Sequence, residues 1–147
     1  DGVLLTPNRK KIDFFNYDFI NQPDLAQTFA VTCCLKNLPF HLKGLKSLKI
    51  KETDRISALK TELAKFGFLL TEPAEGELSW SGEKKDACHF EETGEISIKT
   101  YDDHRMAMAF APAALLFPIA IEHPEVVSKS YPTFWEDVEK IKKGKVN

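Results

Sequence analysis

The stretch DHRMAMAFAPAALLF, residues 103–117, decides the fold. After its first three residues it is nearly all apolar, and a second stretch of this kind, DLAQTFAVTCCLKN, occupies residues 24–37. Both begin with Asp, a residue that favours a helix start. A helix that is apolar almost all round must be buried on almost every side. We therefore predict two inner helices.

The segments around these two helices repeat. Pro39 follows Asp24 at a distance of fifteen positions, and Pro118 follows Asp103 at the same distance. Each proline precedes a short segment that alternates like a strand. We interpret this as two copies of a strand–helix–strand–helix unit, offset by about 79 residues,. The second copy lacks the return strands that follow the first.

Periodicity and turn residues give the other elements. We expect two more helices, at residues 54–66 and 131–143. We expect strands at residues 12–20, 40–43, 68–71, 77–81, 96–100 and 119–122. These elements predict an α/β fold, α+β in some schemes, in which sheets cover inner helices. The charged starts of the helices would emerge at one rim, where aligned helix dipoles favour anions.

The composition describes a globular chain of about one domain, with 147 residues of which 43% are hydrophobic,. Its formal net charge of −2 argues against a nucleic-acid binder, because affinity for a phosphate backbone needs an excess of Lys and Arg,. No apolar run reaches membrane length, and the N-terminus lacks the layout of a signal peptide. We expect a cytoplasmic protein that binds neither membrane nor nucleic acid.

The cysteines and the first residue add two expectations. Cys33, Cys34 and Cys88 have no metal-ligand spacing, and adjacent cysteines are poorly placed to bridge each other, so we expect reduced, structural thiols,. The chain begins at Asp1 without Met and runs straight into a strand-like segment. We therefore expect a piece of a longer protein.

A first charged cluster is KETDR, residues 51–55. If residue 51 falls in or near the first turn of the following helix, Lys51 and Arg55 lie four residues apart and point the same way. They would form a two-cation clamp with Glu52 beside it. Arg suits a carboxylate or phosphate because its planar fork donates two parallel hydrogen bonds.

A second charged cluster is YDDHR, residues 101–105. Capping does not explain His104 and Arg105, because a cation at the positive end of a buried helix costs free energy unless an anion answers it. Asp24 is the repeat mate of Asp103. Lys129 is a further lone cation, just before an aromatic helix start.

Ordinary roles also stay open for these acids. Asp54 would cap the helix at 54–66, with Glu62 and Lys65 on its exposed face. Asp24 and Asp103 would equally serve as helix caps. Taken together, however, the clusters gather acids, cations and a histidine at helix starts, without a Cys/His metal spacing, a Gly-rich phosphate loop or a Gly-x-Ser-x-Gly elbow. We expect a substrate with several negative charges, handled by acid–base chemistry with no metal and no cofactor.

The motifs resemble those of a known family. KETDR at 51–55, YDDHRMAMAFA at 101–111, PDLAQT at 23–28 and SKSYPTFW at 128–135 are similar to motifs in the C-terminal part of EPSP synthases, in the same order and with similar spacing. The resemblance extends over almost the whole chain. It implies transfer of the enolpyruvyl group of phosphoenolpyruvate to the 5-hydroxyl of shikimate 3-phosphate, through a tetrahedral intermediate that loses phosphate.

The resemblance also implies the domain organisation. The family has two similar domains, each of three βαβαββ units with the helices inside, and its substrates bind between the domains. This chain would be part of the C-terminal domain, about two of its three units, at roughly 12–82 and 94–147. The N-terminal domain would be absent from it and would be its partner in the parent chain.

The resemblance assigns proton transfer and the shikimate side of the site to four residues. Asp24 matches the base that takes the hydroxyl proton, and Glu52 matches the acid that protonates the methylene carbon of phosphoenolpyruvate. Lys51 matches a residue that contacts shikimate 3-phosphate and supports proton transfer. Ser47 replaces an Asn that often contacts the shikimate phosphate; it still offers a hydroxyl but reaches less far.

The resemblance assigns the phosphoenolpyruvate side to five residues. Arg55, Arg105 and Lys129 match residues that grip phosphoenolpyruvate, and Asp103 and His104 line the same site, His104 among the catalytic groups. Two alternatives stay open. One is a related transferase that acts on a UDP-sugar, and the other is a non-enzymatic module of similar build that binds anions or RNA.

Overall fold

The computed structural model describes residues 3–4, 6, 10–51, 53–85, 91–92 and 94–142. Its elements, with η for a 3-10 helix, are β1 (Phe15–Asp18), η1 (Pro23–Leu25), α1 (Ala26–Leu35), β2 (Phe40–Lys43), η2 (Lys46–Ile50), α2 (Arg55–Ala64), β3 (Leu78–Trp80), β4 (Ile96–Ile98), α3 (His104–Phe110), η3 (Ala111–Leu115), β5 (Ile119–Ile121), η4 (Pro124–Lys129) and α4 (Phe134–Lys142).

The same parallel strand–helix–strand motif occurs twice, as the repeat predicts. β1 and β2 are parallel, with Phe15 opposite Phe40, and α1 connects them. β4 and β5 are parallel, with Ile96 opposite Ile119, and α3 connects them. A helix crossover is the usual way to join parallel neighbours. β3 then pairs antiparallel to β2, which gives the sheet order β1–β2–β3.

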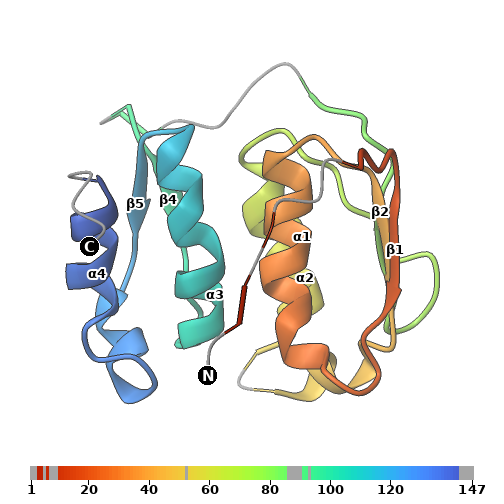
Figure 1. The fold of residues 1–147 in the computed structure, drawn as a ribbon, viewed down its shortest axis with the longest axis horizontal. Coiled ribbons are helices and arrows are strands. Elements are labelled where there is room, and N and C mark those ends of the chain that lie inside the picture. Colours follow the sequence, from red (N-terminus) through yellow and green to blue (C-terminus); the bar gives the residue numbers. More distant parts are fainter. Residues whose placement is uncertain are drawn as a thin grey trace.

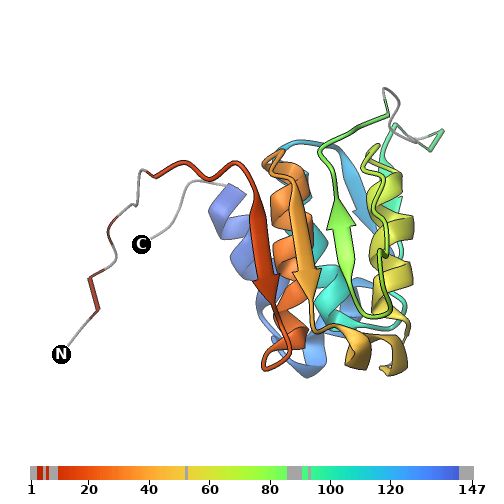
Figure 2. The same ribbon diagram turned by 90° about the vertical axis from the view of Figure 1, so that its right-hand side faces the viewer.

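The two inner helices lie side by side between the sheets. Figure 1 shows α1 and α3 in the middle, with the three-stranded sheet on one side and β4–β5 on the other, and α1 packs directly against α3. Figure 2 shows the three-stranded sheet in front of the helices that it covers. The expected α/β arrangement of inner helices covered by sheets is confirmed.

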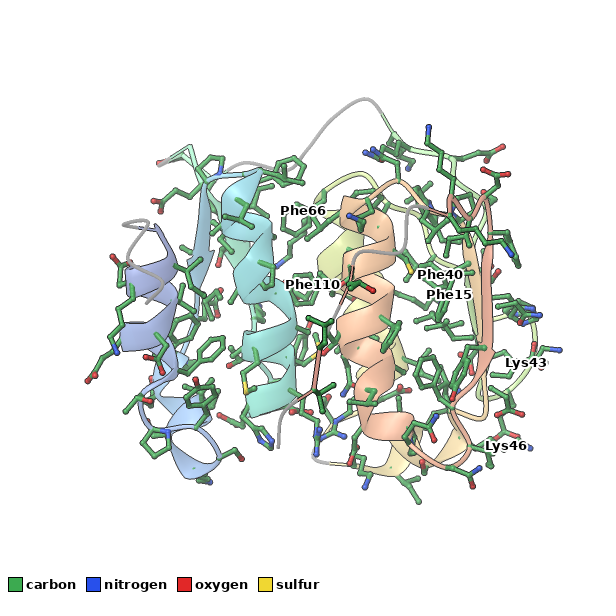
Figure 3. All side chains as sticks on the ribbon, viewed as in Figure 1. Phe15, Phe40, Lys43, Lys46, Phe66 and Phe110 are labelled. Carbon is green, nitrogen blue, oxygen red and sulfur yellow. The ribbon has the colours of Figure 1, made fainter. Side chains whose placement is uncertain are left out.

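Aromatic rings pack between the end of α2 and the helical segment that begins with α3. Phe66, just after α2, stacks on Phe110 of α3 with ring centroids 6.2 Å apart, and it meets Phe117 edge-on at 5.1 Å. Figure 3 shows Phe66 and Phe110 near each other between the helices, and Phe15 and Phe40 between α1 and the sheet. Offset and edge-on contacts of this kind stabilise a core beyond the area they bury.

Burial of the inner helices is less complete than expected. One face of α1 is exposed, and it includes Thr28, Phe29 and Thr32, with Phe29 38% exposed. The polar hydroxyls of Thr28 and Thr32 are compatible with water, so these two residues are the signal in this mostly apolar stretch that one face of α1 is exposed. The stretch 103–117 also fails to form one helix, because α3 ends at Phe110 and η3 follows. Pro112 is the cause, since it has no N–H for the α-helical hydrogen bond and its ring clashes with the preceding turn.

Other boundaries differ in detail. The strand expected at 68–71 is reduced to isolated bridges that join Phe68 to Lys84 and Thr71 to Ser79. The helix expected from residue 131 begins at Phe134. The segments η2 and η4 were not predicted, because short 3-10 helices leave no periodic pattern. Within the described ranges, no helix combines the length and the apolar character that crossing a membrane requires.

The two described cysteines are buried thiols in α1. Cys33 is 4% exposed and Cys34 is fully buried, and both are free; Cys88 lies outside the described residues. Burial raises the pKa of the Cys33 thiol to about 11, and it raises the pKa of Cys34 further, with the neighbouring Cys33 adding to the rise. The thiolate is the reactive form, so these groups are protected.

We therefore expect Cys33 and Cys34 to react slowly with iodoacetamide in the folded protein. Raising the pKa of Cys33 from 9.0 to about 11 lowers its thiolate fraction near pH 8 roughly a hundredfold, and burial slows access further,. Mass spectrometry after timed alkylation, with and without urea, measures the difference. Equal rates in the folded and unfolded protein would contradict the burial of Cys33 and Cys34.

Candidate active site

The helix starts converge at one end of the molecule. α1, α2 and α3 all begin at the lower end in Figure 1, and η1, η2 and η4 lie at that end too. η2 packs against both η1 and α2, and η4 packs against α3. The charged residues before each helix are therefore brought to one rim, as the sequence predicts.

Asp103 and Arg55 form a buried ion pair at this rim. Asp103 caps α3, because its Oδ1 accepts a hydrogen bond from Arg105 N at 2.8 Å. Its Oδ2 accepts from Arg55 Nε at the start of α2. The Arg55 side chain is 2% exposed and that of Asp103 is 0% exposed. A buried carboxylate needs such partners, since desolvation otherwise penalises its charge.

Asp24 joins both arginines. Its Oδ1 accepts from Arg55 Nη1 at 2.8 Å, and its Oδ2 lies 3.1 Å from Arg105 Nη2. Arg105 Nη1 also donates to the Asp24 carbonyl oxygen at 3.4 Å. Asp24 lies within η1 and does not cap α1, whose N-cap is Leu25, so the capping role is wrong for this residue. The Asp24 carboxylate is the negative partner of the Arg105 cation at the start of α3.

Gln27 contacts two of these residues, and the sequence patterns assign it no role. It is fully buried in the first turn of α1. With its side-chain amide turned to satisfy both ends, its nitrogen donates to the Asp24 carbonyl oxygen at 3.2 Å and its oxygen accepts from Arg55 Nε at 3.3 Å. Its place in the PDLAQT motif was the available signal. Gln27 holds η1 against α2.

Lys51 and Arg55 do not form the two-cation clamp that the KETDR motif predicts. Asp54 is the N-cap of α2, as one alternative predicts, and its Oδ1 accepts from Ile56 N and Ser57 N at 3.1 Å. The helix therefore begins at Arg55, and Lys51 lies in extended backbone after η2. Lys51 and Arg55 share no helical face, because the cap falls between them, and Lys51 is exposed while Arg55 is buried.

Glu62 and Lys65 do not lie on a solvated face. The Glu62 side chain is 0% exposed, and Lys65 Nζ donates to Glu62 Oε2 at 2.6 Å and to the Ser97 carbonyl oxygen at 2.7 Å. The expectation of an exposed pair is therefore wrong. The Ser97 carbonyl oxygen in β4 is a second partner for Lys65.

The other predicted site residues do not join the network of Asp24, Arg55, Asp103 and Arg105 directly in the described part of the chain. Ser47 in η2, Lys51 after it and Lys129 at the end of η4 are exposed, and His104 is the half-buried first residue of α3. Glu52 lies outside the described residues. The hydrogen-bonded network Asp24–Arg55–Asp103–Arg105, called the rim cluster below, is thus the part of the site that the structure joins directly.

The rim cluster can bind an anion by exchange. Its two carboxylates and two guanidiniums balance in charge, and Lys51 and Lys129 on neighbouring segments add positive charge. An arriving phosphate or carboxylate can take the place of Asp24 on the two forks, which leaves the Asp24 carboxylate available as a proton acceptor. No group of three or more His, Cys, Asp or Glu side chains among the described residues is placed to hold a metal ion.

Inner helices covered by sheets, with acids and arginines at the joined helix starts, define an enolpyruvyl-transferase-like protein. The sequence profile of EPSP synthase (3-phosphoshikimate 1-carboxyvinyltransferase) matches residues 3–138. This chain belongs to the EPSP synthase family.

Individual relatives agree with this membership. The chain is 54% identical over 140 residues to a 3-phosphoshikimate 1-carboxyvinyltransferase of Bacteroides fragilis, with 95% of the chain and 33% of the relative covered. It is 38% identical to that of Cellvibrio japonicus, with 83% of the chain and 27% of the relative covered. A solved EPSP synthase structure from Acinetobacter baumannii superposes with a TM-score of 0.62 at 28% identity, over 80% of this chain and 27% of that one. The chain spans about a third of the length of the curated relatives it matches.

Proposed function

We propose that this chain is part of a 3-phosphoshikimate 1-carboxyvinyltransferase, and that it carries one side of that enzyme's active site. The observation that supports this most is the rim cluster, which joins Asp24, Arg55, Asp103 and Arg105 from three helix starts in a member of this family. The reaction moves the enolpyruvyl group of phosphoenolpyruvate to the 5-hydroxyl of shikimate 3-phosphate and releases phosphate.

In this proposal the rim cluster holds phosphoenolpyruvate. Arg55 and Arg105 donate to its anionic groups, and Lys129 approaches from η4. Asp103 keeps Arg55 in place through the buried contact with its Nε. Preorganised cations at a water-excluded site stabilise charge that develops during the reaction, without reorganising at that moment.

Proton transfer falls to the carboxylates. When the anion takes the arginines, Asp24 accepts the proton of the attacking 5-hydroxyl, while Glu52 gives a proton to the methylene carbon of phosphoenolpyruvate. The resulting tetrahedral intermediate then loses phosphate, while its methyl carbon returns a proton to the Glu52 carboxylate, which restores the double bond of the enolpyruvyl group. Lys51 and Ser47 lie on and beside η2, which packs against the η1 segment that carries Asp24. They would face shikimate 3-phosphate, and His104 would support the reacting groups from the start of α3.

The rest of the enzyme would complete the site. We propose that this chain forms about two of the three units of a C-terminal domain and that an N-terminal domain of the parent protein supplies the opposite wall. The parent protein is the proposed longer natural chain that carries these residues. The cytoplasm is the proposed location, because both substrates are multiply charged metabolites that do not cross a bilayer unaided.

Activity of the parent protein tests this function. We expect phosphate release that requires both phosphoenolpyruvate and shikimate 3-phosphate, and we expect none above background from the isolated 147 residues, because half of the site is missing. A coupled phosphate assay measures both, and a reaction without shikimate 3-phosphate is the control. Turnover by the isolated chain, or a parent protein that uses a UDP-sugar instead, would contradict the proposal.

A further inference from the structure

An unusual turn presents the rim cluster residues of α3. Tyr101 and Asp102, just before Asp103, both have a φ of 55°. A bulky residue rarely adopts this left-handed conformation, because its Cβ crowds the backbone. The turn closes with a hydrogen bond from Asp103 N to the Thr100 carbonyl oxygen at 3.0 Å. Strained backbone of this kind persists where its surroundings hold it, so the contacts of Tyr101 show what holds the turn.

Glu62 of α2 makes the principal contact. Its Oε1 accepts from the Tyr101 hydroxyl at 2.7 Å, and its Oε2 accepts from the Lys99 backbone N at 3.2 Å. Lys65 pairs with the same carboxylate at 2.6 Å and reaches the Ser97 carbonyl oxygen. A single carboxylate from the first half of the chain, fully buried, therefore binds the end of β4 and the following turn. Burial and the Glu62 contact both raise the pKa of Tyr101, so its hydroxyl stays protonated and donates.

Glu62 and Arg55 grip the same turn from one helix face. They are seven residues apart in α2, which is almost two complete helical turns, so their side chains point the same way,. Arg55 binds Asp103, and Glu62 binds Tyr101, two residues earlier. The turn is thus attached to α2 at two points, and only one of them belongs to the anion site.

We propose that Glu62 and Tyr101 are positioning residues for the phosphoenolpyruvate side of the site. Their hydrogen bond fixes the left-handed turn, so that Asp103 meets Arg55 and Arg105 meets Asp24. Both residues act through the rim cluster and not on the substrate. The inference rests on the proposed function where it names phosphoenolpyruvate, and it goes beyond that function by assigning a role to the first residue of the YDDHR motif.

A positioning role differs measurably from a purely structural one. A residue that only stabilises the fold changes the melting temperature and leaves the kinetic constants of the folded enzyme alone. A residue that sets the turn changes affinity for the anion held by Arg55 and Arg105. It should leave Ser47 and Lys51, which would contact shikimate 3-phosphate, in place, because they lie on and beside η2.

The test is Tyr101→Phe in the parent protein, which removes one hydroxyl and keeps the ring. We expect the KM for phosphoenolpyruvate to rise about three- to tenfold, the range of one lost hydrogen bond, with the KM for shikimate 3-phosphate within about twofold of the natural enzyme. The control is Leu63→Ala, a cavity at the fully buried neighbour of Glu62. It should lower the melting temperature without changing either KM at 25 °C.

Two outcomes would overturn the positioning role. One is a Tyr101→Phe enzyme with both KM values unchanged, and the other is an equal rise in both. If Tyr101→Phe does not fold, Glu62→Asp tests the same bond, because it keeps the charge and shortens the reach to Tyr101. A crystal structure of the variant gives a readout that does not depend on activity. We expect residues 101 and 102 to leave positive φ and the contact between Arg105 and Asp24 to be lost.

The crystal structure also separates this inference from the proposed function. A parent protein without any enolpyruvyl transfer would refute the function, while the variant structure would still decide whether Tyr101 sets the turn. Conversely, an active parent enzyme whose Tyr101→Phe structure keeps the turn and the contact between Arg105 and Asp24 would refute the positioning role alone.

Discussion

Replacing Arg55 with Met should destabilise the protein by about 3–5 kcal/mol, the range for breaking a buried ion pair from one side. Arg55 is 2% exposed, and its Nε donates to an Asp103 carboxylate that is 0% exposed. Met keeps much of the side-chain volume, so the loss comes mainly from the carboxylate that stays buried without its cation. The midpoint of urea unfolding, at an unchanged dependence on urea, measures the effect.

A second substitution shows whether the stranded charge is the cause. In Arg55→Met with Asp103→Asn, the buried carboxylate is gone, while the Asn side-chain oxygen can still accept from Arg105 N at the start of α3. The double variant should therefore be more stable than Arg55→Met alone, with a coupling of about 1–3 kcal/mol. Lys140→Met, which breaks an exposed pair with Asp137, should leave the midpoint unchanged,. A double variant as unstable as the sum of its single changes would contradict the buried pair.

Local signals were enough to predict the frame of this fold. The spacing from Asp to Pro in each repeat reflects a helical connection that leads into a strand, η1 and α1 in the first copy and α3 and η3 in the second. Both strand pairs are parallel as a result. The convergence of Asp24 and Asp103 follows from the same repeat, because equivalent helix starts of packed units lie at the same end. Asp54 and Asp103 act as caps, as their positions before apolar runs predict.

Contacts between distant segments were not predicted, and they decide the surroundings of the site. The sequence pattern predicts an exposed Glu62 because charged side chains usually are exposed, yet its partners Lys99 and Tyr101 lie 37 and 39 residues further along the chain. One signal was available: Glu62 follows Leu59 by three residues and precedes Phe66 by four, so it lies on the apolar face of α2. Lys51 differs from its expected place because the cap at Asp54 makes the helix begin at Arg55, beyond Lys51.

Replacing Asp24 with Asn should slow turnover of the parent protein and tighten the binding of free anions. Asn cannot accept the hydroxyl proton, so kcat should fall about 10²- to 10⁴-fold, the usual contribution of a general base. The same change removes the carboxylate that occupies Arg55 at 2.8 Å and Arg105 at 3.1 Å. Inorganic phosphate then competes with no internal anion, and its Kd should fall about tenfold, in line with the strength of charge-assisted hydrogen bonds.

Slower turnover combined with tighter phosphate binding would indicate a lost proton acceptor, because general damage to the site would weaken both activity and binding. Glu136→Gln makes the same change in net charge at an exposed position of α4 and should alter neither quantity. Glu52→Gln should lower kcat as Asp24→Asn does, since it removes the other proposed proton carrier. Isothermal titration with phosphate and steady-state kinetics give the two numbers. If Asp24→Asn weakens phosphate binding along with kcat, Asp24 holds the arginines in place for the anion, and the base must be sought elsewhere in the parent protein.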